Sequence, residues 1–444
     1  MGALANVQST AVGAFNEALK IDYEKGIINA LNNEQPVLKM MKSDSESWTG
    51  LQVQFPAKVG RNISAAATAE GYLVHAPGKQ TYKDWVIPVK YNHGRIRLTA
   101  QVMKASEKSK GAFAKALGSE IEGLVEDLAN YRGRLVFGFG KGVLALVNGD
   151  PGTGTTITVD SPAGVLGAVN GSRHIQVGQF IAFIDPATGA IRAGGARTVA
   201  TVPSTGLTFT ISAAADAAVA DNDFIVSAMN SDTTDVNETT YGGGGTNGSN
   251  CAEQMGLLGL IDDTTYVSTL HGIDRSTAPG NYMQGTVVAS VGALSADVMQ
   301  RAIDTVYEKA RGKTDAIVCH SSVRRAYQVM LENDRRYMAA SLMRPDGGTV
   351  AAKGQKLDFG GIEITVDKDA PYATMFGLDT ETFTRYILTE GEWADESGSV
   401  LRFVDGYDAY EAIYRIFDNF GCEKPQSNWR LDGITANVVV VHLP

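Results

Sequence analysis

The chain has 444 residues, 44% of them hydrophobic and 20% charged, which is ordinary globular composition and enough for roughly two to three compact units. Its formal net charge of −10 excludes a protein that binds nucleic acid mainly by neutralising phosphates with clustered Lys and Arg. Its three cysteines, Cys251, Cys319 and Cys422, are too widely spaced for a disulfide framework or a repeated zinc motif, which fits synthesis in a reducing cytoplasm.

Residues 1 to 45 predict an extended arm with short helical pieces. The sequence opens without a basic and then apolar leader, so we expect neither a secretion signal nor a lipid anchor. Apolar residues follow at helical spacing before Pro36. A terminal segment of this kind needs a partner surface for Phe15, Tyr23 and Val37, such as a neighbouring subunit.

Between Trp48 and Leu98 the apolar residues alternate with polar ones, which predicts strands. Residues 51–55 lead outward, and residues 86–91 and 95–98 lead back, so we expect a long two-stranded hairpin. Its tip, Gly60 to Asp84, is small and polar and has too few large apolar residues for a core. Because an isolated hairpin is marginally stable in water, this one should rest on a surface outside itself.

The strongest helical pattern of the chain comes next. Residues 109–137 place apolar side chains three and four positions apart among charged ones, which predicts one amphipathic helix of roughly 40 Å. Glycine at Gly138 and Gly140 predicts its end.

Lysine is then absent from Gly142 to Glu308, and Gly, Thr, Ala and Val dominate. Short apolar runs between Gly, Pro and Asp turns predict strands at residues 155–159, 175–184, 197–202, 207–211 and 224–226. We therefore expect a small all-β domain over about 147–230. A flexible polar stretch, Asn230 to Asn250, should follow it.

From Leu294 the pattern is helix, buried strand, helix. Ser295 and Ser321 can each cap a helix, and residues 316–319 form a short apolar strand between them, which predicts an α/β layer. Further strands are predicted at residues 362–366, 385–388 and 410–416 and at Val438.

No chemical motif assembles a catalytic, cofactor or metal site. Gly312-Lys313-Thr314 has the ending of a phosphate-binding loop, but Tyr307 replaces its first glycine and the segment follows a helix, so we expect an ordinary turn. Cys319 and His320 are adjacent on a strand and point to opposite faces, which prevents a dyad. Asp262-Asp263 should begin a turn, and no two histidines have metal-ligand spacing. We therefore predict a protein that is not an enzyme.

Three stretches, together with this order of elements, carry a resemblance to a known family. The stretches are His271 to Ser276 leading to Ser295, Asp315 to Tyr327, and Tyr407 to Ile434. Arm, hairpin, long helix, β insertion, α/β unit and returning strands follow one another as in the tailed-bacteriophage major capsid proteins of the Hong Kong 97-like fold. The resemblance covers nearly the whole chain.

The resemblance implies an α+β fold with named parts. These are an N-arm (1–45), an E-loop hairpin (46–100), a spine helix with part of the peripheral domain (101–146), an inserted β domain (147–230), a linker returning to the peripheral domain (231–285), an axial domain (286–400) and peripheral return strands (401–444). The sequence has no long, charged N-terminal segment like the fused scaffold of some members, so we expect scaffolding either from a separate protein or from a segment that has been cleaved away.

The resemblance also implies self-assembly into hexamers and pentamers of an icosahedral head around double-stranded DNA, in the virion of a phage made in the host bacterial cytoplasm. Partners would be neighbouring subunits and, further, scaffold, portal and decoration proteins, with no membrane and no cofactor. The expected inter-subunit contacts are Phe15, Val53, Phe55, Lys79, Lys83, Val86, Val89 and Tyr91. Lys79 and Lys83 lie where crosslinking members carry a reactive Lys, but no partner Asn is evident, so we predict no covalent crosslinks.

Two other functions stay open on the sequence. An encapsulin-type nanocompartment would share the fold, although the large insertion counts against it. A phage tail or adhesin protein would explain the β-rich middle, although the arm, hairpin and helix order does not fit it.

Overall fold

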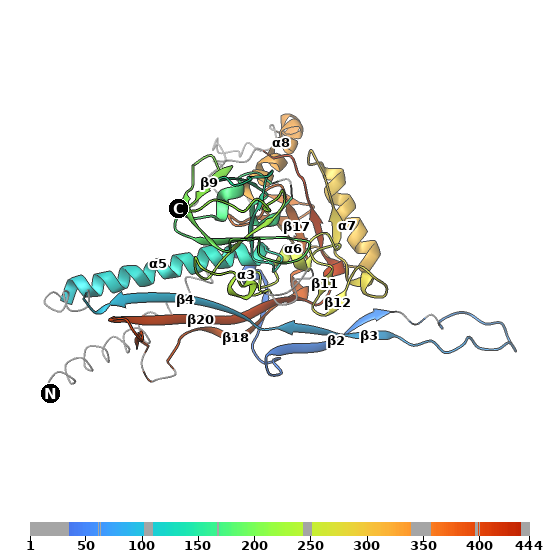
Figure 1. The fold of residues 1–444 in the computed structure, drawn as a ribbon. Helices are drawn as coiled ribbons and strands as arrows, with labels where there is room; N and C mark the ends of the chain where they lie inside the picture. Colours follow the sequence, from blue (N-terminus) through green and yellow to red (C-terminus); the bar gives the residue numbers. More distant parts are fainter. Residues whose placement is uncertain are drawn as a thin grey trace, which may run out of the picture.

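The computed structural model describes residues 35–60, 62, 64–101, 110–166, 168–242, 251–338, 357–395, 398 and 400–436. Within them the chain combines helices with five β-structures, one of which is a hairpin that projects far from the body (Figure 1). The predicted mixed α and β composition is confirmed. No helix of the described part is long and apolar enough to span a bilayer.

A five-stranded sheet underlies the long helix. Its strands are β1 (Lys42–Asp44), β4 (Lys90–Thr99), β18 (Phe383–Trp393), β19 (Arg402–Phe403) and β20 (Ala409–Cys422). Helix α5 (Lys110–Phe137) runs along this sheet (Figure 1). Ile96 and Leu98 of β4 pack with Ile121 and Leu128 of α5, because both elements turn an apolar stripe toward each other. The predicted helix and its end before Gly138 are confirmed.

The hairpin consists of β2 (Gln52–Gly60) and β3 (Thr81–Pro88), paired antiparallel. The expectation that residues 90–98 also belong to it is wrong. Strand β4 instead pairs with β20 over its whole length, from Lys90 with Asp418 to Thr99 with Ala409. The two strands are separated only by Val89, so alternation along the sequence could not show that the chain changes sheets there.

A closed barrel follows α5, with the strand order β10-β5-β6-β9-β8-β7. The bounds are Val143–Val147 for β5, Thr156–Asp160 for β6, Phe180–Ile184 for β7, Arg197–Thr201 for β8, Thr208–Ile211 for β9 and Phe224–Ser227 for β10. Its interior holds apolar side chains such as Val147, Ile157, Phe209 and Ile225. Closure pairs every strand on both sides and leaves no open edge.

Strand β5 was not predicted, and it is the strand that closes the barrel by pairing with β6 and β10. The described start of the predicted flexible stretch is also packed, since Thr233, Thr239 and Tyr241 are buried. That expectation is corrected for residues 239–242, whereas most of residues 230–238 are exposed. Residues 243–250 lie outside the described residues.

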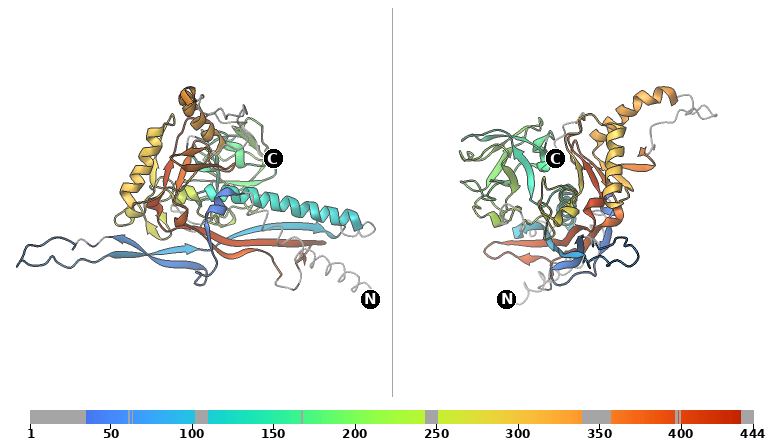
Figure 2. Two further views of the ribbon diagram at one scale, coloured as in Figure 1. Left: turned by 180° about the vertical axis from the view of Figure 1, so that it is seen from behind. Right: turned by 90° about the vertical axis from the view of Figure 1, so that its right-hand side faces the viewer.

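A six-stranded sheet with two helices forms the other part of the body. Its strands are β13 (Thr286–Val288), β14 (Ala316–Cys319), β15 (Asp358–Phe359), β16 (Ile362–Val366), β17 (Met375–Leu378) and β21 (Trp429–Leu431), and its helices are α7 (Ala296–Ala310) and α8 (Ser321–Met338). Ser295 caps α7 as predicted, because its Oγ accepts the Val298 N–H at 3.3 Å. Seen from the side, the barrel and this sheet stand next to each other above the long sheet (Figure 2).

Two predicted boundaries differ from this arrangement. Strand β18, expected in the α/β part, joins the long sheet, and β21, expected among the return strands, joins the six-stranded sheet. The sheet that each strand joins depends on its pairing with segments far away in the sequence, and no local sequence pattern indicates that pairing. The predicted strand at Val438 lies outside the described residues.

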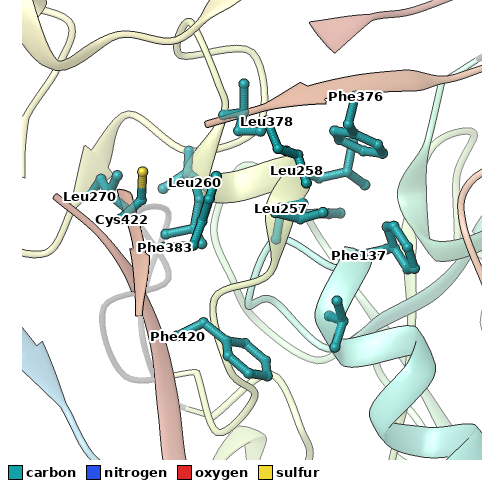
Figure 3. Packing of buried hydrophobic residues seen from close by; sticks show 14 of the residues in the cluster. Phe137, Leu257, Leu258, Leu260, Leu270, Phe376, Leu378, Phe383, Phe420 and Cys422 are labelled. Carbon is teal, nitrogen blue, oxygen red and sulfur yellow. The ribbon is translucent and has the colours of Figure 1, made fainter. Parts of the chain in front are cut away.

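One apolar cluster connects these parts. It brings together Phe137 of α5, Leu257 and Leu258 of α6 (Leu257–Leu260), Phe376 of β17 and Phe420 of β20 (Figure 3). Burial of these side chains holds helix, sheets and hairpin base in one body.

Candidate assembly surface

The two strands of the hairpin are amphipathic. Val53 stands opposite Ile87 and Phe55 opposite Trp85, so these side chains share one face. Trp85 and Ile87 are fully buried, and Val59 is 1% exposed. The opposite face is exposed and polar, with Gln52, Gln54 and Lys58 among its residues. The base of the hairpin is therefore amphipathic, and its apolar face needs another element to bury it.

The cover is a small hairpin of the same subunit, β11 (Thr269–Leu270) and β12 (Ile273–Asp274). His271 and Gly272 form its turn with φ values of 47° and 85°, and a two-residue turn of this hand needs positive φ at both positions. The His271 carbonyl accepts the Val86 N–H at 2.9 Å, and the His271 ring meets Trp85 edge-on at 5.1 Å between centroids. We call Trp85, Val86 and His271 the hairpin clamp.

The clamp histidine is uncharged at neutral pH. Burial, with smaller effects from the Arg275 and Lys90 charges, lowers the pKa of His271 to about 3. A neutral imidazole can lie against Trp85 without the cost of burying a charge.

A buried ionic network lies next to the β11–β12 hairpin that carries the clamp histidine. Arg275 donates to the carbonyl oxygen of Val267 at 2.6 Å and lies 3.6 Å from Asp262, while Arg430 donates to Asp262 Oδ1 at 3.1 Å. The other carboxylate oxygen of Asp262 accepts the N–H groups of Tyr266 and Val267, each at 2.9 Å. The predicted turn at Asp262 is confirmed. Burial lowers the pKa of Arg275 to about 10, which leaves it charged at neutral pH.

Val53 and Val89 do not offer a contact surface to a neighbour, which corrects the prediction for both. They are 2% and 6% exposed, and Val37 of the arm, at 1%, is also enclosed by its own subunit. The sequence shows that these side chains need burial, but it does not show that the β11–β12 turn and the central cluster supply it. Phe55 and Val86 are half-buried.

The tip of the hairpin is exposed. Tyr72, Leu73 and Val74 are 77%, 94% and 75% exposed. Lys79 and Lys83 are exposed as well, and Tyr91, at 45%, lies on β4 in the long sheet and not on the hairpin. Phe15 lies outside the described residues. Of the expected contacts, the structure thus leaves the two lysines and Tyr91 accessible.

Sequence reasoning missed Tyr72-Leu73-Val74. These are consecutive large apolar residues in a segment of small and polar ones, which was the available signal. Consecutive apolar residues in a projecting segment are typical of a binding surface, because their exposure to water is unfavourable and a partner can bury them.

The remaining motifs occupy structural positions. Cys319 is buried, and burial raises the pKa of its thiol to about 12, so it is an unreactive thiol. Gly312 follows the left-handed Arg311 that ends α7. Within the residues that the structure describes, no three His, Cys, Asp or Glu side chains are grouped to hold a metal ion.

Comparisons with known proteins show similarity to phage capsid proteins. Residues 225–399 match the family model described as SU10 major capsid protein. The cyanophage A-1(L) capsid asymmetric unit is 11% identical with a TM-score of 0.50, over 90% of this chain and 93% of that chain. The capsid of Myoviridae phage XM1 is 9% identical with a TM-score of 0.38, over 89% and 90%. Gordonia phage Cozz is 9% identical with a TM-score of 0.37, over 91% and 87%.

No curated protein sequence matches the chain. The family model and the shared fold confirm the resemblance to tailed-phage major capsid proteins that the sequence predicted.

Proposed function

We propose that this chain is a phage major capsid protein and that it assembles into the hexamers and pentamers of an icosahedral head that encloses double-stranded DNA. The observation that carries the proposal is the exposed apolar tip Tyr72-Leu73-Val74, held away from the body by a hairpin whose base is clamped in its own subunit. No described part of the same subunit covers this apolar group, so its burial calls for another molecule.

The energetics favour many equivalent contacts. Full burial of one large apolar side chain contributes about 1.5–3 kcal/mol, so a single tip gives a modest gain. A closed shell repeats the contact at every subunit, and repetition makes weak contacts sufficient. The partner is therefore a second copy of the chain.

We assign the parts of the family fold to the elements of this structure as follows. The hairpin β2–β3 is the E-loop, α5 is the spine helix, the six-stranded sheet with α7 and α8 is the axial domain, and the barrel is the inserted domain. The net charge of −10 suits a container that holds DNA without sequence preference and must release it. The protein would reside in the virion after synthesis in the host cytoplasm.

The test replaces the tip. Tyr72→Ser, Leu73→Ser and Val74→Ser together should leave the soluble subunit folded, with unchanged circular dichroism and melting temperature, and should reduce particles counted by electron microscopy at least tenfold. The control is Val177→Ser with Leu207→Ser on the barrel, which removes two exposed apolar side chains, 64% and 51% exposed, and should assemble normally.

Normal particle yield from the tip variant would contradict the proposal. The content of wild-type particles separates the head from a nanocompartment: double-stranded DNA supports the head, and an enzyme cargo without DNA contradicts it.

A further inference from the structure

Arg173 joins the barrel to the loop beside the six-stranded sheet, together with a hydrogen bond of 3.4 Å from Asn170 Nδ2 to the Tyr372 hydroxyl. Arg173, in the short helix η3 (Gly171–His174) of the barrel, donates to the Ala370 carbonyl oxygen at 3.2 Å and to that of Lys368. Its guanidinium lies 4.6 Å above the ring of Tyr372. The loop after β16 therefore receives both hydrogen bonds and a cation–π contact from the barrel.

Tyr372 also contacts His320, which belongs, like Tyr372, to the part with the six-stranded sheet. The rings of His320 and Tyr372 are 4.5 Å apart between centroids at an interplanar angle of 82°. His320 precedes α8, and its Nδ1 accepts the backbone N–H of Ser322 at 3.2 Å and lies 2.9 Å from Ser322 Oγ. Nδ1 therefore carries no proton, and the neutral imidazole caps the first turn of α8.

A proton on Nδ1 would disturb this junction in two ways. It would replace the acceptor of the Ser322 N–H with a second donor, and it would place a positive charge at the positive end of the helix dipole. Burial, and then the charges of Arg173 from η3 and Arg325 from α8, lower the pKa of His320 to about 4.

The loop contributes the other charges at this junction. Lys368 donates to Asn130 of α5 at 3.0 Å, Asp367 Oδ1 accepts the Asp369 N–H at 2.9 Å, and burial raises the pKa of Asp367. On the barrel side His174 is uncharged, because burial and the charges of Arg173 and Arg134 lower its pKa. Because burial raises the pKa of Asp367, protonation of its carboxyl favours the closed junction and opposes the effect of His320 on acidification.

We propose that Arg173, Tyr372 and His320 form an acid-sensitive latch that holds the barrel against the six-stranded sheet at neutral pH and releases it on acidification. The latch lies within one subunit, so it goes beyond assembly and does not depend on the proposed function. Its direction follows from linkage. In the open state His320 regains an ordinary pKa near 6.5, so the closed latch is fully favoured above that pH and weakens as the pH falls toward 4.

The test compares the full-length wild type with His320→Asn. Asparagine can accept the cap hydrogen bond through its side-chain oxygen and does not titrate. Hydrogen exchange of the amides of residues 170–175 and 367–373 is measured for both proteins at pH 7, 6 and 5. Taking the ratio of the two proteins at each pH cancels the intrinsic pH dependence of exchange and the titration of every other group, Asp367 included.

The expected ratio, wild type over variant, is near 1 at pH 7 and rises to about 30 at pH 5. Amides of β20 serve as the internal control and should keep a ratio near 1. A ratio that stays near 1 at the latch, or that rises equally in β20, would overturn the proposal.

A measurement on the wild type alone guards against a variant that does not fold. Nuclear magnetic resonance of the His320 ring in the full-length subunit should show a titration near pH 4. Titration near pH 6.5 would show that the closed junction does not oppose the proton, and would also overturn the latch.

Discussion

The base and the tip of the hairpin are made from the same two stretches of chain, yet their apolar side chains have opposite surroundings. At the base Trp85 is fully buried, and at the tip Leu73 is 94% exposed. The base lies against the His271-Gly272 turn and the central cluster of its own subunit. The difference shows that a hairpin can project from its subunit when its base is packed there. Hydrophobicity alone does not distinguish the apolar residues packed within the subunit from those exposed at the tip.

The largest effect is expected at the base. Trp85→Ala should lower the free energy of unfolding by about 3–5 kcal/mol, because it leaves a cavity next to His271 and Phe55. Urea denaturation of the unassembled subunit measures it. Tyr82→Ala is the control on the same strand, where a side chain 57% exposed should change stability by less than about 0.5 kcal/mol. Equal losses in the two variants would show that the base is not clamped.

A smaller loss of folding stability is expected when acid protonates His271 of the hairpin clamp. The pKa of His271 is about 3 in the folded state and 6.5 in its unperturbed state, so its contribution to stability is full above pH 6.5 and falls as the pH drops below it. Wild type should therefore lose about 2 kcal/mol more than His271→Asn between pH 7 and pH 5. Asparagine tolerates the positive φ of the turn.

Urea denaturation of both proteins at the two pH values gives this difference directly. His174 and His320, whose pKa values are also lowered by burial, contribute equally to both proteins and cancel. Identical pH dependence in wild type and variant would mean that His271 becomes protonated without opening the clamp.

The smallest effect on stability is expected at the tip. Leu73→Ser should change the free energy of unfolding by less than about 0.5 kcal/mol, because the side chain has almost no contact to lose within its own subunit. Thermal unfolding of the unassembled subunit tests this. A loss above about 1 kcal/mol would place the tip on the body of its own chain and remove the contrast with Trp85.

Much of the local structure was predictable because it follows local patterns. The helix that ends at Phe137 and most barrel strands follow from the periodicity of apolar residues within one segment. The cap at Ser295 follows from a single serine before a helical segment. Strand partners were not predictable in the same way. Strand β4 follows β3 closely yet pairs with β20, more than three hundred residues later, and only the three-dimensional arrangement selects that partner.

The candidate surface was predictable in place but not in detail. Alternation at residues 51–55 and 86–89 indicated side chains that need burial, and nothing local distinguished a cover within the subunit from a neighbour. Arg275 and Arg430 gave no signal either, because a buried arginine has the same local sequence as an exposed one. Their shared carboxylate, Asp262, is fully buried and joins segments far apart in the sequence.

The lysine-free barrel has a consequence for chemical labelling. Amine-directed dyes and crosslinkers react with accessible lysines, and the chain has none from Gly142 to Glu308, whereas Lys58, Lys79 and Lys83 are exposed along the hairpin. A reagent of this kind would mark the projecting element and leave the whole barrel unmodified. The subunit thus carries a built-in chemical contrast between the part proposed to reach its neighbours and the part that stays with its own body.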